Sequence, residues 1–386
     1  MVEPCAVVLD VGKTNLKLCA VDRAGNALRT LTRPNAVRSG PPYPHFDVDG
    51  ILDWAVAGLR SLARELAIEA VVPVAHGAAA ALLAGDELAL PVLDYEFEGV
   101  GACDAEYEPL ARDFARTFSP RLAAGLNLGR QLFWLERTFP GEFARVTHVL
   151  PYPQYWAFRL SGAKISEVTS LGCHTDLWEP ERGAFSRLAR ARGWDALFPE
   201  RASAWTRIGT HEPGIAVVAG IHDSNASYLA HRAFREDPFT VVSTGTWVVC
   251  MAHGGDLSRL RPDLDTLANV DAFGAPVPCS RFMGGREFAE ASNRREATRR
   301  CALQTDRCLS LLDAKGDLVV EGSFAANRDY CALLASLRPG QPAYVSRDPT
   351  GTLRGAALLA FWPPAPALAP RLEPCTPLVG VLPPAP

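Results

Sequence analysis

The sequence CAVVLDVGKTNLKLCAV, residues 5–21, decides the fold, because it places two short apolar runs on either side of a polar turn. Ala6–Leu9 and Leu16–Val21 read as strands, and a third strand is expected at Ala27–Leu31 after the turn DRAGN. The gaps are too short for a crossover helix, so the strands must be antiparallel neighbours. The sequence therefore predicts an antiparallel meander at the start of the chain.

The first turn also carries groups that suit a phosphate. In it, backbone N–H groups and Thr14 can face phosphate oxygens while Asp10 approaches a magnesium ion. The string Gly12-Lys13-Thr14 suggests a P-loop, but Val7 stands where that motif needs glycine, and a strand follows instead of a helix. A polar hairpin turn without a ligand remains the alternative for this segment alone.

Length and composition narrow the class of protein. The 386 residues favour two domains. The composition, with 48% hydrophobic and 21% charged residues, is that of a globular protein. Its formal net charge of -4 gives no excess of positive charge that would attract nucleic acid, so small molecules are the expected partners. We find no signal peptide and no apolar run that could span a membrane. The ten cysteines form no C-x-x-C pair, and we interpret them as reduced thiols of a cytoplasmic protein.

A second segment, after the middle of the chain, shows the same pattern of apolar strands around a polar turn. The strand IAVVAG, residues 215–220, precedes a hairpin FTVVSTGTWVVCMA, residues 239–252, in which apolar strands again flank a turn rich in glycine and hydroxyl side chains. This repetition predicts an internally duplicated phosphate-binding fold. We expect an N-terminal domain at residues 1–235 and a C-terminal domain at residues 236–386. The C-terminal domain is expected to end in a Pro-rich tail from Pro363. Helices are expected at residues 51–67, 126–137, 155–160, 222–233, 327–337 and 353–362.

Three further segments could carry chemistry. Asp223 follows a buried strand where a helix begins, which suits a proton acceptor but equally suits a helix N-cap. Gly245 and Thr246 could grip a triphosphate, although both residue types are common in strands and turns. The segment from Gly322 to Asn327 could admit an adenine ring close to its backbone, and a plain strand-to-helix connection explains it nearly as well.

Taken together and in this order, these segments resemble the FGGY family of carbohydrate kinases. The matching parts are Asp10 to Thr14, Gly220 to Asp223, Gly245-Thr246 and Gly322 to Asn327, and the helix around Gly355 resembles the final helix of the family. The resemblance covers nearly the whole chain. It implies an α/β fold of two actin-like, ribonuclease H-like domains with a nucleotide cleft between them.

The resemblance also implies roles for individual residues. It implies that Asp223 is the catalytic base and that Asp10 and Asp223 form the magnesium site. The residues implied for ATP are Gly12, Lys13, Thr14, Asn15, Lys17, Gly245, Thr246, Gly322, Ser323 and Asn327. The residues implied for the sugar are His76, Gly77, Asp94, Tyr95, Glu96, Gln154 and Asp223. For His76 a satisfied surface histidine remains the alternative.

The activity that follows is transfer of the γ-phosphate of MgATP to a hydroxyl of a small sugar. The segment Phe282-Met283-Gly284-Gly285-Arg286-Glu287-Phe288 resembles rhamnulokinase-like members and favours a ketose, such as L-rhamnulose, L-fuculose, ribulose or xylulose. A homodimer is a further expectation. The alternatives are a non-catalytic sugar or nucleotide sensor on the same scaffold, and an actin- or chaperone-like ATPase that acts on proteins.

Overall fold

The structure is a computed structural model that describes residues 4–111, 113–212, 214–347 and 351–377. Of the predicted Pro-rich tail, residues 378–386 lie outside the described residues. Its described part is not a loose extension, because Leu372–Pro374 form the edge strand β21, a position where proline is tolerated.

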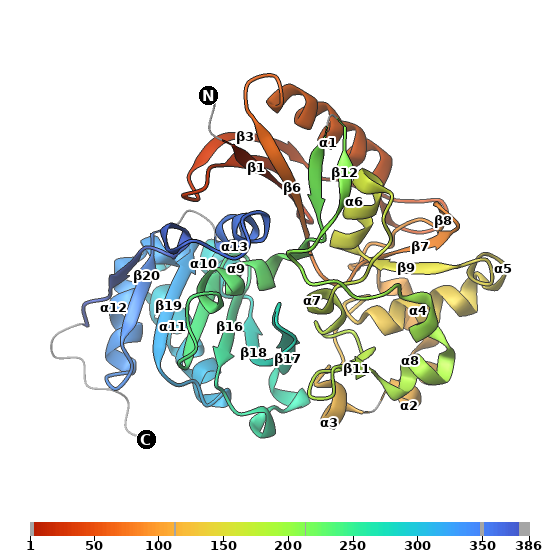
Figure 1. The fold of residues 1–386 in the computed structure, drawn as a ribbon. Helices are drawn as coiled ribbons and strands as arrows, with labels where there is room; N and C mark the ends of the chain where they lie inside the picture. Colours follow the sequence, from red (N-terminus) through yellow and green to blue (C-terminus); the bar gives the residue numbers. More distant parts are fainter. Residues whose placement is uncertain (1–3, 112, 213, 348–350, 378–386) are drawn as a thin grey trace.

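The first half of the chain builds one mixed sheet, drawn in the upper part of Figure 1. Its strands run in the order β12-β13-β6-β1-β2-β3, and the short β14 also pairs with β6. The antiparallel meander predicted at the start of the chain is present, whereas β1, β6 and β13 are parallel. The strands are β1 (Cys5–Val11), β2 (Asn15–Val21), β3 (Ala27–Pro34), β6 (Ile68–Ala75), β12 (Arg207–His211), β13 (Ile215–Val218) and β14 (Ile221–His222).

The second half repeats this arrangement. Read from the opposite edge, its sheet has the order β21-β20-β19-β15-β16-β18, with β17 added beyond β18. Here β15, β16 and β18 form the antiparallel meander and β19 and β20 are the parallel strands, so the predicted duplication is present. The strands are β15 (Phe239–Thr244), β16 (Val248–His253), β17 (Thr266–Val270), β18 (Pro276–Phe282), β19 (Asp317–Gly322) and β20 (Ala343–Ser346).

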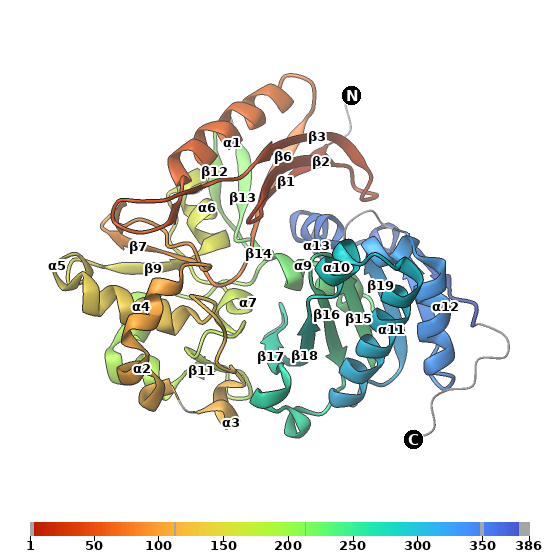
Figure 2. The same cartoon turned by 180° about the vertical axis from the view of Figure 1, so that it is seen from behind.

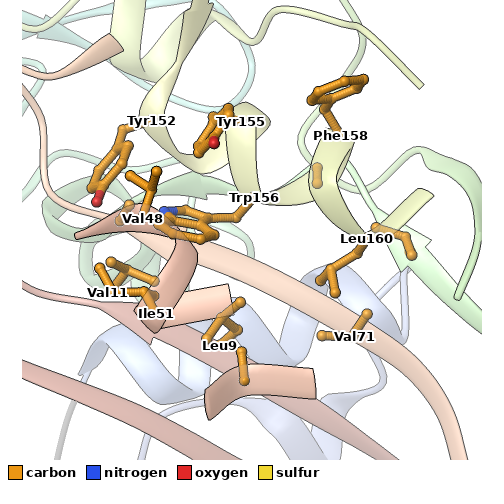
Figure 3. Close-up of a cluster of buried hydrophobic side chains, with 14 of the residues drawn as sticks. Leu9, Val11, Val48, Ile51, Val71, Tyr152, Tyr155, Trp156, Phe158 and Leu160 are labelled. Atoms are coloured by element: carbon orange, nitrogen blue, oxygen red, sulfur yellow. The ribbon is translucent and has the colours of Figure 1, made fainter. Parts of the chain in front are cut away.

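Both faces of the first sheet are buried, which explains its continuous apolar strands. Leu9 and Val11 point to the face covered by α1 (Val48–Leu62) and α6 (Tyr152–Ser161), where Trp156 lies at the centre of the core shown in Figure 3. Their neighbours Ala6 and Val8 point to the opposite face, which is covered by α9 (Asp223–Arg232) and α13 (Gly351–Ala360). Because successive side chains of β1 point to opposite faces of the sheet, this one strand contributes side chains to two separate hydrophobic cores.

The second sheet is covered in the same way. Its outer face packs against α11 (Arg294–Leu311) and α12 (Arg328–Leu337), as Figure 2 shows. Its inner face receives α9, whose Tyr228 ring stacks on Phe239 at a centroid distance of 5.5 Å. The helices α9 and α13 therefore lie between the two sheets, and each contributes to the joint that connects them.

A helix-rich insertion between β6 and β12 forms a further lobe beside the first sheet. It has its own core, in which Leu132 and Trp178 are buried, and this core also receives Val270 of the second sheet. Its elements include β7 (Ala80–Ala84), β8 (Glu87–Leu90), α2 (Asp104–Ala111), α3 (Phe114–Thr117), α4 (Leu128–Thr138), α5 (Pro140–Phe143), β9 (His148–Pro151), α7 (Val168–Leu171), β10 (Trp178–Glu179), β11 (Ala184–Phe185) and α8 (Arg187–Arg192). Two small strands, β4 (Val37–Arg38) and β5 (His45–Phe46), pair before α1, and α10 (Gly284–Glu290) follows β18.

The predicted division at residue 235 falls in the loop between α9 and β15. It stays a prediction, since α13 belongs to the second half of the chain but packs on β1 and β6 of the first sheet. All ten cysteines lie within the described residues as free thiols. Within the described part of the chain, every helix is too short or too polar to cross a membrane.

The crossing of α9 and α13 leaves no room for a side chain at Gly355. A Cβ at this position would lie 1.7 Å from the carbonyl oxygen of Ala226. We expect Gly355→Ala to push the helices apart and to lower the free energy of unfolding by about 1–3 kcal/mol, seen as a lower midpoint of thermal unfolding. Gly141→Ala is the matched control, because a Cβ there meets open space on another helix. Equal midpoints for the two variants would contradict the packing.

Candidate active site

The carboxyl ends of three neighbouring strands bring the predicted catalytic residues together. On β1, Asp10 lies beside Val74 of β6, and Ile221 of β14 lies on the other side of the same residue. Asp223 follows β14 directly, and His76 follows β6. Ligand chemistry in α/β sheets gathers at such an edge, so the structure assembles one site from segments far apart in the sequence.

Asp223 is the first residue of α9 and not its cap. The N-cap position belongs to His222, whose side chain makes no capping hydrogen bond. The Asp223 carboxylate instead accepts a hydrogen bond of 2.6 Å from the Ser224 N–H, and its Oδ1 lies 3.2 Å from Nε2 of His222. Its side chain is 35% exposed, which leaves room to accept a proton. Asp223 thus lies in the first turn of α9, where the backbone N–H groups of a helix point outward.

Asp10 lies in the electrostatic field of Asp223. Burial and, next to it, the charge of Asp223 raise the pKa of Asp10 to about 6, against the opposing effect of Lys17. The Nζ of Lys17 lies 3.8 Å from the Asp10 carboxylate. A cation between the two carboxylates would be attracted by the negative charge of both.

The residues present fit a magnesium ion of the kind that kinases use. Among the described residues no group of three or more His, Cys, Asp or Glu side chains could hold a metal ion by itself. Magnesium is usually bound by one or two carboxylates together with substrate phosphates, and it does not require such a group. Asp10 and Asp223 would supply the carboxylates.

A pocket of about 560 Å³ lies between the two halves of the molecule, and we call it the interdomain pocket. From the first half, His76, Gly77, Tyr95 and Glu96 line it, as expected for the sugar site. The structure adds residues that the sequence did not single out, and these are Arg121, Cys173, His174, His222, Ser224, Trp247, Asp265, Leu267, Asn269, Cys279, Arg281 and Arg286. Three of these had a local signal, since His222 lies in the segment from Gly220 to Asp223, Trp247 follows Thr246 in the second hairpin, and Arg286 lies in the segment from Phe282 to Phe288.

His76 is buried and is not a surface histidine. Its Nδ1 lies 2.9 Å from the carbonyl oxygen of Gly77, while its Nε2 has no hydrogen-bond partner among the described residues. Burial lowers the pKa of His76 to about 4, so the ring is neutral at pH 7. Because the Nδ1 holds the proton, the Nε2 lone pair is free to accept a hydrogen bond from a ligand hydroxyl.

Three other predicted sugar residues, Asp94, Gln154 and Asp223, lie outside the lining of this pocket, although His222 and Ser224 on either side of Asp223 line it. Asp94 is ion-paired with Lys13, which also lies 3.3 Å from Glu96. Gln154 is fully buried, and its side-chain amide donates to the carbonyl oxygens of Ala219 at 3.1 Å and Gly220 at 3.2 Å. Gln154 therefore braces the turn before β14. Lys13, expected at a phosphate, is instead paired with two carboxylates, one of which, Glu96, lines the interdomain pocket.

A second pocket, of about 760 Å³, gathers the predicted nucleotide residues of the second half, and we call it the hairpin pocket. Thr244 pairs with Gly322 across β15 and β19, which brings the two segments side by side. A Cβ at Gly322 would lie 2.0 Å from the Thr244 carbonyl oxygen, so this approach requires glycine. The residues that line the pocket are Gly245, Thr246, Gly285, Arg286, Phe288, Ala289, Ser323, Phe324, Ala326 and Asn327.

The remaining predicted nucleotide residues have local structural roles. Asn327 caps α12 by accepting a hydrogen bond of 3.1 Å from the Tyr330 N–H, although it still lines the hairpin pocket. In the first hairpin, the Gly12 N–H donates to the Asn15 carbonyl oxygen at 3.0 Å, and the Asn15 side chain donates to Thr14 at 3.1 Å. This closes a tight turn next to Asp10.

Comparisons with known proteins agree with this architecture. A carbohydrate kinase from Novosphingobium aromaticivorans superposes with a TM-score of 0.87 at 33% identity, over 98% of this chain and 94% of the other. A xylulose kinase from Lactobacillus acidophilus superposes with a TM-score of 0.80 at 14% identity, over 97% of this chain and 94% of the other. The predicted fold of two actin-like domains is confirmed. The fold and site thus define a two-domain α/β protein of the sugar kinase class.

Sequence similarity identifies the family. The family model described as "Carbohydrate kinase FGGY, C-terminal domain" matches residues 236–300 and 291–369. An L-fuculokinase of Salmonella typhi is 25% identical over 283 residues, which are 67% of this chain but 58% of the relative, so the match spans less than two thirds of that relative. Together with the 33% identity over nearly the whole chain noted above, these matches show that the chain belongs to the FGGY family of carbohydrate kinases.

The raised pKa of Asp10 predicts a pH-dependent effect of its removal. Because the pKa rises from 3.8 to about 6 on folding, the folded state binds this proton more tightly than the unfolded chain. The resulting stability is complete below pH 3.8 and is lost as the pH rises through 6. We therefore expect Asp10→Asn to raise the unfolding temperature relative to the wild type more at pH 8 than at pH 4.5. The exposed Asp53→Asn should show no such trend, and a pH-independent difference for Asp10→Asn would contradict the assignment.

Proposed function

We propose that the protein transfers the γ-phosphate of MgATP to a hydroxyl of a small sugar. One observation carries the proposal: the interdomain pocket and the hairpin pocket share Arg286, so a molecule in one adjoins a molecule in the other. The interdomain pocket receives the sugar, and the hairpin pocket receives the nucleotide. Kinase relatives and family membership support this division.

In this mechanism the protein positions reactants and neutralises charge. Asp223 accepts the proton of the attacking hydroxyl as the general base. Asp10 and Asp223 would hold a magnesium ion, which would supply charge neutralisation to the phosphate oxygens. Gly245, Thr246 and Ser323 surround the nucleotide in the hairpin pocket, and Gly322 allows the close approach of β15 and β19 beside it.

The acceptor is a small sugar of the ketose type. L-fuculose, L-rhamnulose, ribulose and xylulose are the first candidates, because the relatives include L-fuculokinases and a xylulose kinase. Neutral His76 supplies a hydrogen-bond acceptor for a sugar hydroxyl, and the Trp247 indole supplies an apolar surface. The cytoplasmic location and the homodimer expected from the sequence stay predictions.

Replacement of Asp223 tests the general base. We expect Asp223→Asn to lower kcat by about 100-fold or more, because it removes the proton acceptor while keeping the size of the side chain. The measurement is coupled ADP release with a panel of ketoses, aldoses and polyols. Nucleotide binding by calorimetry is the control and should be retained. Near-normal turnover in a folded variant would exclude Asp223, whereas nucleotide binding without turnover by the wild type would favour the sensor.

Gly245 offers a separate test of the hairpin pocket. A Cβ at this position meets no atom within 4 Å, so Gly245→Val should fold normally. Its side chain would occupy space that the nucleotide needs, and we expect the KM for ATP to rise by about tenfold or more at an unchanged unfolding temperature. Gly340→Val is the matched control, since its Cβ also meets open space but lines neither pocket. An unchanged KM for ATP would place the nucleotide elsewhere.

A further inference from the structure

We infer that Thr169 and Glu167, on the insertion lobe, are positioning residues for the general base Asp223. The Thr169 hydroxyl, oriented by the Glu167 carboxylate, holds the backbone next to Asp223 and so sets where the base meets the acceptor hydroxyl. This inference rests on the proposed function and deepens it, because it gives the insertion lobe a part in the proton transfer. Neither residue lines the interdomain pocket or the hairpin pocket, so both act through Asp223 and not on the reactants.

The backbone that leads to Asp223 is held by a side chain of the insertion lobe. β14, the two-residue strand that ends at His222, pairs with β6 and with no other strand in the described part of the chain. The His222 N–H donates to Oγ1 of Thr169 at 3.2 Å. Thr169 therefore receives an N–H group that a neighbouring strand would otherwise have to accept, and it fixes the residue directly before the base.

The Glu167 carboxylate determines how the Thr169 hydroxyl is used. A hydroxyl group has one hydrogen to donate and two lone pairs that can accept. Thr169 donates its hydroxyl hydrogen to Oε2 of Glu167, and the same oxygen accepts the Thr169 N–H at 3.0 Å. Because the hydroxyl hydrogen is engaged by Glu167, the hydroxyl oxygen meets the His222 N–H as an acceptor.

Glu167 is an uncommon residue for this position. It is fully buried, and its Oε1 has no hydrogen-bond partner among the described residues. It occupies the N-cap position of α7, where Ser, Thr, Asp and Asn are the preferred residues. Burial of a carboxylate with an unpaired oxygen costs stability, and a cap for a helix of four residues does not require it. The contact with the Thr169 hydroxyl gives this buried carboxylate a role beyond the cap.

Thr169 also contacts the chain beyond the base. The side-chain amide of Asn225, two residues after Asp223, donates to the Thr169 carbonyl oxygen at 3.4 Å and to the Val270 carbonyl oxygen at 2.8 Å. The helix α7 is itself held against β17, because a Cβ at Gly172 would lie 2.2 Å from Val270. One residue of the insertion lobe is therefore attached to the chain on both sides of Asp223.

These attachments bear on the reaction because a general base must lie within hydrogen-bond reach of the hydroxyl that it deprotonates. A misplacement of about 1 Å can lower a rate by about 100-fold. Loss of the Thr169 hydroxyl should therefore lower kcat, while the KM for ATP stays unchanged. A residue that acts only through Asp223 has nothing to position once the base is removed, so its effect should vanish in an Asp223→Asn background.

The test measures coupled ADP release with the best acceptor of the sugar panel. We expect Thr169→Val to lower kcat by about 10–100-fold at an unchanged KM for ATP, and Thr169→Ser, which keeps the hydroxyl, to retain most of the activity. Combined with Asp223→Asn, Thr169→Val should cause no further loss. Ser170→Ala is the matched control and should behave as the wild type, because the buried Ser170 hydroxyl on the same helix has no hydrogen-bond partner among the described residues.

Glu167 gives an independent variant in case Thr169→Val does not fold. We expect Glu167→Met to lower kcat in the same way, and Glu167→Gln, which keeps an acceptor oxygen, to retain most of it. Near-normal kcat in folded Thr169→Val or Glu167→Met, or an equal loss with and without Asp223, would overturn the inference. The kinase function would then still stand, whereas the absence of acceptor-dependent ADP release by the wild type with every sugar would refute the proposed function itself.

Discussion

The close crossing of α9 and α13 is the constraint on which the rest of the structure depends. Gly355 lies against the backbone of Ala226, so the helices meet without intervening side chains. Glu321 of β19 then fixes α9 to the second sheet through Ser227 and through His231 at 3.3 Å. Because Asp223 begins α9, its position is set by both sheets. Any change in how the halves meet must move the base relative to both pockets.

Local signals made the duplicated fold predictable. Short apolar runs around Gly12 and Gly245 identified both hairpins, and the structure confirms them with boundaries that differ by a few residues. The position of Asp223 followed from motif order, since its immediate surroundings equally suited a cap. What local patterns do not encode is the pairing of distant side chains. Lys13 meets Asp94 from 81 positions away, and no periodicity in either segment indicates this contact.

The resemblance also implied a sugar contact for a side chain whose amide is engaged within the scaffold. Gln154 has the groups of a sugar ligand, but its amide is used by the backbone of Ala219 and Gly220. This backbone cannot pair there as a regular strand, because Gly220 has a φ of 83° between β13 and β14. The side chain therefore satisfies carbonyl groups that the sheet leaves free. It acts on the site indirectly, by fixing the strand that leads to Asp223.

The electrostatic design of the interdomain pocket depends on its histidines being neutral. Burial lowers the pKa of His76 to about 4 and of His174 to about 3, and it also lowers the pKa of His222. These rings consequently add hydrogen-bonding groups without adding charge at pH 7. The charged groups that line the pocket are then Glu96, Glu98 and Arg121 from the first half and Asp265, Arg281 and Arg286 from the second. Since each half of the molecule supplies part of this lining, the pocket is complete only when both sheets are in place, which is the arrangement that the joint of α9 and α13 maintains.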